Sequence, residues 1–213
     1  GQRITKAYKL DEDGYSIHVE VRVETLSNLS KVNSLKFRSI LLDMSNLDIA
    51  HLAHEGSLFE YSVSRENNAI FRKGNATKFA SKENKVEAGL VSWVGFRDRY
   101  FCIIVKPEFK TSGYEITDLS ASKLELTIKT EDLPAVESNS YKFLVYVGPQ
   151  DLKVLNTYDS GFGDILSFSN FGLFDLCAKG IYHLINWLHT IIPSWGTCII
   201  LVSFIIYGAL YPL

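Results

Sequence analysis

The last part of the chain, from Trp195 to Leu213, contains no aspartate, glutamate, lysine, arginine or histidine. An α-helix over these residues would be about 28 Å long, close to the roughly 30 Å hydrocarbon core of a bilayer. Helices in the core of soluble proteins seldom carry so long an uncharged run, so we expect a transmembrane helix over residues 193–213. The rings of Trp195 and Tyr211 lie near its two ends, where amphipathic aromatic side chains favour the membrane interface.

The preceding segment, residues 170–192, has a different pattern, because its apolar residues recur every three or four positions, as on one helical face. These residues are Phe171, Phe174, Ala178, Ile181, Ile185, Leu188 and Ile192. Polar residues such as Lys179 and His183 fall opposite them. We expect an amphipathic helix that lies along the membrane surface with Trp187 as an interface anchor. The alternative is an amphipathic helix packed on the soluble domain. Pro193 then ends the helix and turns the chain.

Charged residues mark the expected domain boundary. After Ile165, the only aspartate, glutamate, lysine or arginine residues are Asp175 and Lys179. We expect a β-sandwich domain over residues 1–158 and a flexible hinge at residues 159–169, where two glycines relax the backbone. The formal net charge is −2 and no basic block could neutralise several phosphates, so nucleic acid is not an expected partner.

Short strands with alternating apolar and polar residues are expected throughout residues 1–158. In the clearest one, apolar residues at Tyr15, Ile17 and Val19 alternate with polar neighbours, and Asp13-Gly14 supplies the preceding turn. The other expected strands are Ile4–Leu10, one around Leu35–Leu42, Phe59–Val63, Ala69–Arg72, Trp93–Phe96, Tyr100–Val105, Tyr114–Ile116, Lys123–Thr130 and Tyr141–Val147. A short helix is expected over Asp151–Leu155. This pattern predicts a mainly β fold, an antiparallel β-sandwich.

No set of residues predicts catalysis or metal binding. His51 and His54 are three residues apart with Glu55 after them, which is not the spacing of a zinc protease helix, so an exposed loop is the simpler interpretation. No Gly-x-Ser-x-Gly motif occurs, and the three cysteines are interpreted as small hydrophobic residues. We therefore expect neither a cofactor nor enzymatic activity.

Several segments resemble the YidC family of membrane protein insertases. The amphipathic helix, the junction Pro193-Ser194-Trp195-Gly196 and the run that closes on Tyr207-Gly208-Ala209-Leu210-Tyr211-Pro212-Leu213 are similar to that family. Tyr146-Val147-Gly148-Pro149, Trp93-Val94-Gly95-Phe96 and the strand from Tyr15 to Val21 resemble parts of its large periplasmic domain. The resemblance implies a β-supersandwich that is incomplete here, because the family's domain usually begins earlier. We therefore expect the chain to be a fragment.

The resemblance also implies a function. It implies that the chain is part of a multi-pass insertase of the bacterial inner membrane, with the β domain in the periplasm. The implied partners are nascent membrane proteins, the Sec translocon and the lipid bilayer, and no cofactor is implied. In the family, membrane helices build a hydrophilic groove for the polar part of a nascent segment, which lowers the cost of carrying polar groups through hydrocarbon.

One position departs from the family. The family usually has an arginine just before the glycine of the closing motif, and Tyr207 stands there in this chain. Ser203, Tyr207 and Tyr211 recur every four residues and share one helical face. They either line a mildly polar groove or hydrogen-bond to neighbouring helices. Two alternatives from other classes are a β-sandwich receptor or adhesion module with a C-terminal anchor, and a mutarotase-like carbohydrate enzyme.

Overall fold

The structure is a computed structural model that describes residues 2–12, 14–25, 35–43, 60–65, 70–74, 85–98, 100–120, 123–131, 138–166 and 172–211. The chain divides into two compact units, Gly1–Ile165 and Leu166–Leu213. The division falls inside the hinge predicted at residues 159–169. The expected loop around His51, His54 and Glu55 lies outside the described residues.

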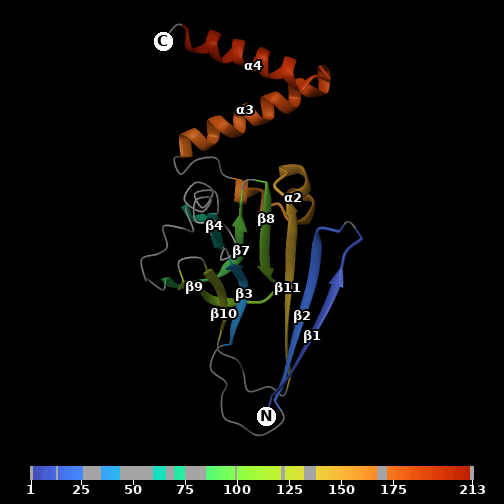
Figure 1. Cartoon of the computed structure of the whole chain (residues 1–213), viewed down its shortest axis with the longest axis vertical. Helices are drawn as coiled ribbons and strands as arrows, with labels where there is room; N and C mark the ends of the chain where they lie inside the picture. The colour runs from blue at the N-terminus through green and yellow to red at the C-terminus, as the bar shows by residue number, and fades with distance from the viewer. Residues whose placement is uncertain are drawn as a thin grey trace. The chain divides into compact units, whose positions relative to one another are not determined.

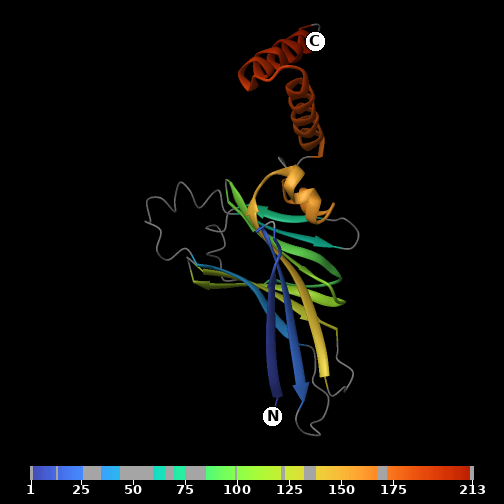
Figure 2. The same cartoon turned by 90° about the vertical axis from the view of Figure 1, so that its right-hand side faces the viewer.

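In its described residues, the first unit contains two antiparallel sheets (Figure 1). Its strands are β1 (Gln2–Leu10), β2 (Ser16–Thr25), β3 (Lys36–Asp43), β4 (Glu60–Arg65), β5 (Ile70–Gly74), β6 (Lys85–Ala88), β7 (Val91–Arg97), β8 (Phe101–Pro107), β9 (Thr111–Ser120), β10 (Lys123–Thr130) and β11 (Ser138–Pro149). One sheet has the order β1-β2-β11-β8-β7-β4-β5, and the other β3-β10-β9-β6. The mainly β, antiparallel fold expected from the sequence is confirmed, and the two layers in Figure 2 are consistent with a β-sandwich.

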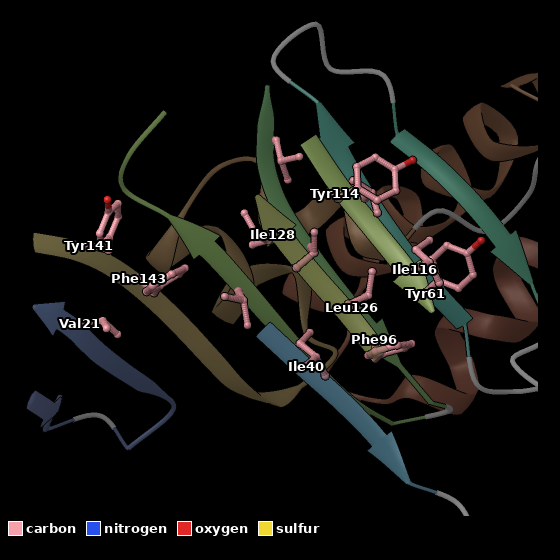
Figure 3. Close-up of a cluster of buried hydrophobic side chains, with 14 of the residues drawn as sticks. Val21, Ile40, Tyr61, Phe96, Tyr114, Ile116, Leu126, Ile128, Tyr141 and Phe143 are labelled. Carbon is pink, nitrogen blue, oxygen red and sulfur yellow. The ribbon is translucent and has the colours of Figure 1, made fainter. Parts of the chain in front are cut away.

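The main hydrophobic core lies between the two sheets (Figure 3). The seven-stranded sheet contributes side chains such as Tyr61, Phe96 and Phe143, and the four-stranded sheet contributes others such as Ile116 and Leu126. Because successive side chains of a strand point to opposite faces, alternate residues enter this core, namely Val19, Val21 and Val23 of β2 and Tyr141, Phe143 and Val145 of β11. The alternation in the sequence therefore has its cause in burial on one face.

A second cluster covers the other face of the seven-stranded sheet. After β11 the chain forms α2 (Leu152–Tyr158) and the 3-10 helix η2 (Phe162–Leu166). Asp151 caps α2 by accepting a 2.8 Å hydrogen bond from the Lys153 backbone amide. The side chains of Leu155, Phe162 and Ile165 are fully buried, as is that of Ile104 on the sheet. The sheet is therefore packed on both faces where these helices lie.

Charged residues from β7 and β8 fasten the end of this unit to the sheet. Arg97 donates from Nη1 to the Ile165 carbonyl oxygen at 2.9 Å and from Nε to Glu60 Oε2 at 2.7 Å. Lys106 pairs with the carboxylate of Asp159, which also accepts a 2.8 Å hydrogen bond from the Gly161 amide. Burial raises the pKa of Asp159, but the hydrogen bonds from Lys106 and Gly161 outweigh it and leave that pKa lowered.

A glycine on β7 makes room for this attachment. A Cβ at Gly95 would lie 2.9 Å from the Ile103 carbonyl oxygen and 3.0 Å from Ile165 Cδ1, both closer than ordinary contact. Residues 162–166 thus form a helix packed on the sheet, where the sequence predicted part of a flexible hinge. The glycines that predicted a flexible segment from the sequence instead allow close packing in the structure. Residues 167–169 of the predicted hinge lie outside the described residues.

The outer face of the four-stranded sheet carries an ion-pair cluster that gives a pH prediction. Glu115 of β9 lies 3.0 Å from Lys36 Nζ of β3 and 3.1 Å from Lys129 Nζ of β10, with 17% of its side chain exposed. The hydrogen bonds from Lys36 and Lys129 lower its pKa. Because the pKa of Glu115 is lower in the folded protein, its ion pairs stabilise the fold at pH values above the ordinary glutamate pKa. This stabilisation disappears as the pH falls through the pKa that Glu115 has in the folded protein.

Glu115→Gln is therefore expected to lower the free energy of unfolding by about 1 kcal/mol at pH 7. The deficit should shrink below the ordinary glutamate pKa of about 4.3 and vanish when Glu115 is protonated. Urea unfolding of both proteins between pH 7 and pH 3 measures it, with the exposed Glu108→Gln as control. A deficit that stayed constant over this range would show that the charge of Glu115 contributes nothing.

The second unit contains two helices, α3 (Gly172–Ile191) and α4 (Trp195–Leu210). Pro193 separates them, and Ser194 is the N-cap of α4. None of the helices in the described residues is both long enough and apolar enough to cross a membrane. The transmembrane helix expected over residues 193–213 is thus not found: α4 has 16 residues, about 24 Å at about 1.5 Å per residue.

Candidate functional site

The candidate site is the surface of α4, because this helix carries the residues that the sequence singled out. One side of α4 packs on α3 through Cys198, which is fully buried, and Val202, which is 3% exposed. The opposite side is open: Phe204 is 71% exposed and Tyr207 is 79% exposed. Ile199, Ile200 and Ile205 are also more than half exposed. Much of the surface of α4 is therefore exposed and apolar, and Phe204 and Tyr207 lie on the side away from α3.

Ser203, Tyr207 and Tyr211 lie together on this open side. At about 100° per residue, Tyr207 is about 180° around the helix from Cys198, and Ser203 and Tyr211 flank it by about 40°. All three are exposed, Tyr211 at 92%. The structure therefore places the three predicted groove residues in one row that faces away from α3. Whether the row lines a groove stays a prediction.

Polar side chains in the helical unit form hydrogen bonds with their own backbone. The Ser203 hydroxyl donates to the Ile199 carbonyl oxygen at 2.8 Å, and Thr190 donates to the Trp187 carbonyl oxygen at 2.6 Å. Asn186 Nδ2 donates to the Tyr182 carbonyl oxygen at 2.9 Å. An internally bonded polar group costs less to remove from water than a free one. This arrangement lowers the cost of bringing the unit into contact with lipid.

The turn between α3 and α4 is held by a ring stack that the sequence analysis missed. The rings of His189 and Trp195 lie 3.8 Å apart between centroids, at an angle of 14°. The Cys198 thiol also lies 3.5 Å from the Ile192 carbonyl oxygen, across the same turn. Trp195, predicted as an interface anchor, is 52% exposed and is thus also a packing residue of the turn. In the sequence, the aromatic rings of His189 and Trp195 on either side of Pro193 could have predicted this stack.

The remaining predicted residues lie around this turn and at the end of α4. Trp187 on α3 is 60% exposed, as an interface anchor would be, and Pro193 lies in the exposed turn. Gly196 and Gly208 lie on α4 with open space around the position of a Cβ, so close packing does not require glycine at either. Pro212 lies outside the described residues.

Reactive groups do not gather in the described part of the chain. Within it, no group of three or more histidine, cysteine, aspartate or glutamate residues could hold a metal ion. Cys102 is 2% exposed. Burial raises the pKa of its thiol to about 12, against a smaller lowering by Arg97. Cys102 therefore stays protonated at neutral pH and is a poor nucleophile.

Comparison with known proteins identifies the β domain. The family model of the YidC periplasmic domain matches residues 1–184. Membrane protein insertase YidC of Syntrophobacter fumaroxidans is 24% identical over 99% of this chain and 37% of its own length. The protein of the same name from Geobacter sulfurreducens is 23% identical over 100% of this chain and 39% of its own length.

Among solved structures, the Slr1438 protein from Synechocystis aligns with 70% of this chain and 55% of its own, at 13% identity and a TM-score of 0.38. The chain spans less than two-fifths of the length of the two insertases compared above. The match to the family model nevertheless extends from the first strand into α3. The chain belongs to the YidC periplasmic domain family.

Proposed function

We propose that this chain is the periplasmic domain and adjoining helical unit of an insertase that helps integral membrane proteins enter and fold in the bacterial inner membrane. The family match over residues 1–184, to relatives named membrane protein insertases, carries the proposal. It favours this function over a receptor or adhesion module and over a mutarotase-like enzyme.

The helical unit is proposed to contact the lipid bilayer. α3 is amphipathic and would lie in the interface with Trp187 as an anchor, because its polar face can remain in water. The open side of α4 would contact the hydrocarbon region, since its exposed residues are mostly apolar and Ser203 is bonded internally. This assignment explains why so large an apolar surface is left uncovered by α3.

The β domain is proposed to be a scaffold outside the membrane rather than an enzyme. Its role would be to hold the helical unit and to offer surfaces to nascent chains and to the Sec translocon. Insertion needs no covalent step, because the gain comes from sheltering polar groups during transfer into hydrocarbon. Within this domain, Arg97 holds η2 on the sheet through its hydrogen bond to the Ile165 carbonyl oxygen.

A crosslinking experiment tests whether the open side of α4 meets substrate. A photoreactive phenylalanine analogue is placed at Tyr207 or at Val202 of the full-length protein in native membranes. Stalled ribosomes then present a nascent membrane protein. Crosslinks to the nascent chain are expected from position 207 and not from position 202, which is buried against α3. Equal crosslinking from both positions, or none from position 207, would contradict the proposal.

Tyr207 gives a prediction about charge. Tyr207→Arg in the full-length protein is expected to increase insertion of a substrate with an acidic tail about fivefold, since attraction between unit charges at about 4 Å is worth roughly 1 kcal/mol in water. Tyr207→Phe keeps the ring without charge and should leave insertion unchanged. Protease protection of the translocated tail is the measurement. If Tyr207→Arg equals the wild type, position 207 does not tune the groove electrostatically.

A further inference from the structure

The middle of the seven-stranded sheet opens between the neighbouring strands β7 and β8 (Figure 1). These strands pair at one end only, and the last pair joins Val94 to Val105. Beyond this pair, β7 continues beside β4 and β8 continues beside β11. Pro107 of β8 favours the separation, because proline has no backbone N–H to donate to a neighbouring strand. The opening is internal to the sheet, since β2 and β11 lie between β8 and β1.

Strand β7 carries an extra residue beside the opening. Trp93 pairs with Ser64 of β4, whereas Val91 pairs with Arg65, the next residue of β4. Ser92 is therefore left over between two pairs, as in a β-bulge. Bulges occur often next to functional sites, where they redirect side chains or end the pairing of strands.

A pocket of about 570 Å³ occupies the opening. Most of its lining comes from three stretches of the β domain: residues 90–93, 106–111 and 159–161. The pairing of Val94 with Val105 closes one end. At the other end, the Val91 amide donates a 2.7 Å hydrogen bond to Oγ1 of Thr111. A pocket closed at both ends suits a compact molecule better than an extended chain.

Two buried polar side chains line this pocket. Ser64 is 5% exposed and Trp93 is 2% exposed. The Nε1 atom of Trp93 lies 3.7 Å from the position of a Cβ on Gly161, another residue of the lining. Among the described residues, neither the Ser64 hydroxyl nor the Trp93 N–H has a hydrogen-bond partner. Because a buried donor without a partner is unfavourable, both groups indicate a bound molecule that accepts hydrogen bonds.

The charged residues of the lining have both signs. Lys106 is paired with Asp159, and the others are Lys110, Glu108 and Asp164. Since neither sign dominates, the lining favours a neutral ligand over an anion or a cation. Its carboxylates accept hydrogen bonds, while its lysines and the two buried groups donate them. A compact molecule with several hydroxyl groups can both donate and accept, and so matches this lining.

We propose that the pocket between β7 and β8 binds a compact, uncharged polyol, such as a monosaccharide. Hydroxyl oxygens of the ligand would accept hydrogen bonds from the Trp93 N–H and the Ser64 hydroxyl. Other hydroxyls would donate to the carboxylates of the lining. This is a recognition site of the β domain that involves no covalent step, and it does not depend on the insertase proposal.

The test uses glucose as the probe and the full-length protein in lipid nanodiscs. Saturation-transfer difference NMR measures binding, which is expected to saturate. Ser64→Ala should weaken the affinity about fivefold, the usual effect of losing one hydrogen bond between neutral groups.

Ser62→Ala is the matched control for this substitution. Ser62 lies two positions before Ser64 on β4, is 1% exposed, and likewise has a hydroxyl without a partner among the described residues. It does not line the pocket, so Ser62→Ala should leave the affinity for glucose unchanged. An unchanged affinity in Ser64→Ala, or an equal loss in both variants, would overturn the proposal.

Two further probes test the class of ligand. Glucuronate adds a negative charge to the same ring, and N-acetylglycine N-methylamide offers amide groups without hydroxyls. Both are expected to bind more weakly than glucose. Tighter binding of glucuronate would assign the pocket to anions, and tighter binding of the amide would assign it to peptides; either result would overturn the proposal. Absence of saturable glucose binding would also overturn it, because the pocket would then hold only water.

Discussion

Phe162→Ala is expected to lower the free energy of unfolding of the β domain by about 3–5 kcal/mol, the usual cost of removing a buried aromatic ring. Phe162 is fully buried in η2, and its ring centroid lies 6.4 Å from that of Tyr146 on β11. The loss would leave a cavity between η2 and the seven-stranded sheet, because both elements are fixed by other contacts. The packing of this face would loosen before the core between the sheets does.

Trp93 reports this change directly. It is 2% exposed, and its Nε1 atom lies 3.7 Å from the position of a Cβ on Gly161. With Trp187 and Trp195 replaced by phenylalanine, Trp93 is the only tryptophan, and its fluorescence follows urea unfolding. Tyr100→Ala is the matched control, since Tyr100 is 65% exposed and should change stability by less than about 0.5 kcal/mol. Equal effects of the two substitutions would contradict the packing of η2 described above.

Arg97→Met is expected to lower the free energy of unfolding by about 2–3 kcal/mol, less than the roughly 3–5 kcal/mol of fully buried pairs. The side chains of Arg97 and Glu60 are 18% and 29% exposed, so water compensates part of the loss. The substitution removes the donor to the Ile165 carbonyl oxygen and leaves the Glu60 carboxylate without its guanidinium. The first loss falls on η2 and the second on β4.

The double variant Arg97→Met with Glu60→Gln separates these two contributions. Removing the charge of Glu60, which Arg97 no longer neutralises, should recover about half of the lost free energy of unfolding. The lost hydrogen bond to Ile165 is not recovered. Urea unfolding gives the stabilities, and hydrogen exchange of residues 159–166 should rise in both variants. If exchange in that segment stays at the wild-type rate, Arg97 does not fasten it to the sheet.

Local patterns predicted most strands but not their order in the sheets. The alternation from Tyr15 to Val23 predicted β2, and Ile4–Leu10 predicted β1, which pairs with β2 as a hairpin. Its turn needs a glycine, because Gly14 has φ of +79°, where side chains are strained. The insertion of β11 between β2 and β8 joins residues as distant as Val21 and Tyr141. Such pairing depends on how the whole sheet assembles, which no local period encodes.

The packing of residues 159–166 could not be predicted from the sequence for a different reason. Gly161 and Gly163 indicated flexibility, but the segment that contains them is held on the sheet by Gly95, Arg97 and Lys106, which lie far earlier in the chain and contact Ile165 and Asp159. The short strand β6 was missed because its residues, Lys85–Ala88, are too few to show a period. By contrast, the short helix predicted over Asp151–Leu155 is found as α2, which begins after Asp151 and extends to Tyr158.

In the helical unit, too, the sequence predicted the helices better than the contacts between them. The stripe of apolar residues predicted a helix over residues 170–192, and α3 covers Gly172–Ile191, with the break at Pro193 as expected. The exposed row of Ser203 and Tyr207 follows from their spacing on one helix. The sequence could not reveal that Cys198 and Val202 form the contact with α3, because apolar residues are distributed all around α4.

We propose above that this chain is part of a membrane protein insertase, and reconstitution of the full-length protein tests that proposal. The full-length native protein is placed in proteoliposomes, and a small membrane protein is synthesised outside them without nucleotide-driven translocation factors. Protease protection of the substrate's translocated segment measures insertion. Protection is expected to rise with the amount of protein in the bilayer. Protection no greater than in protein-free liposomes would contradict it.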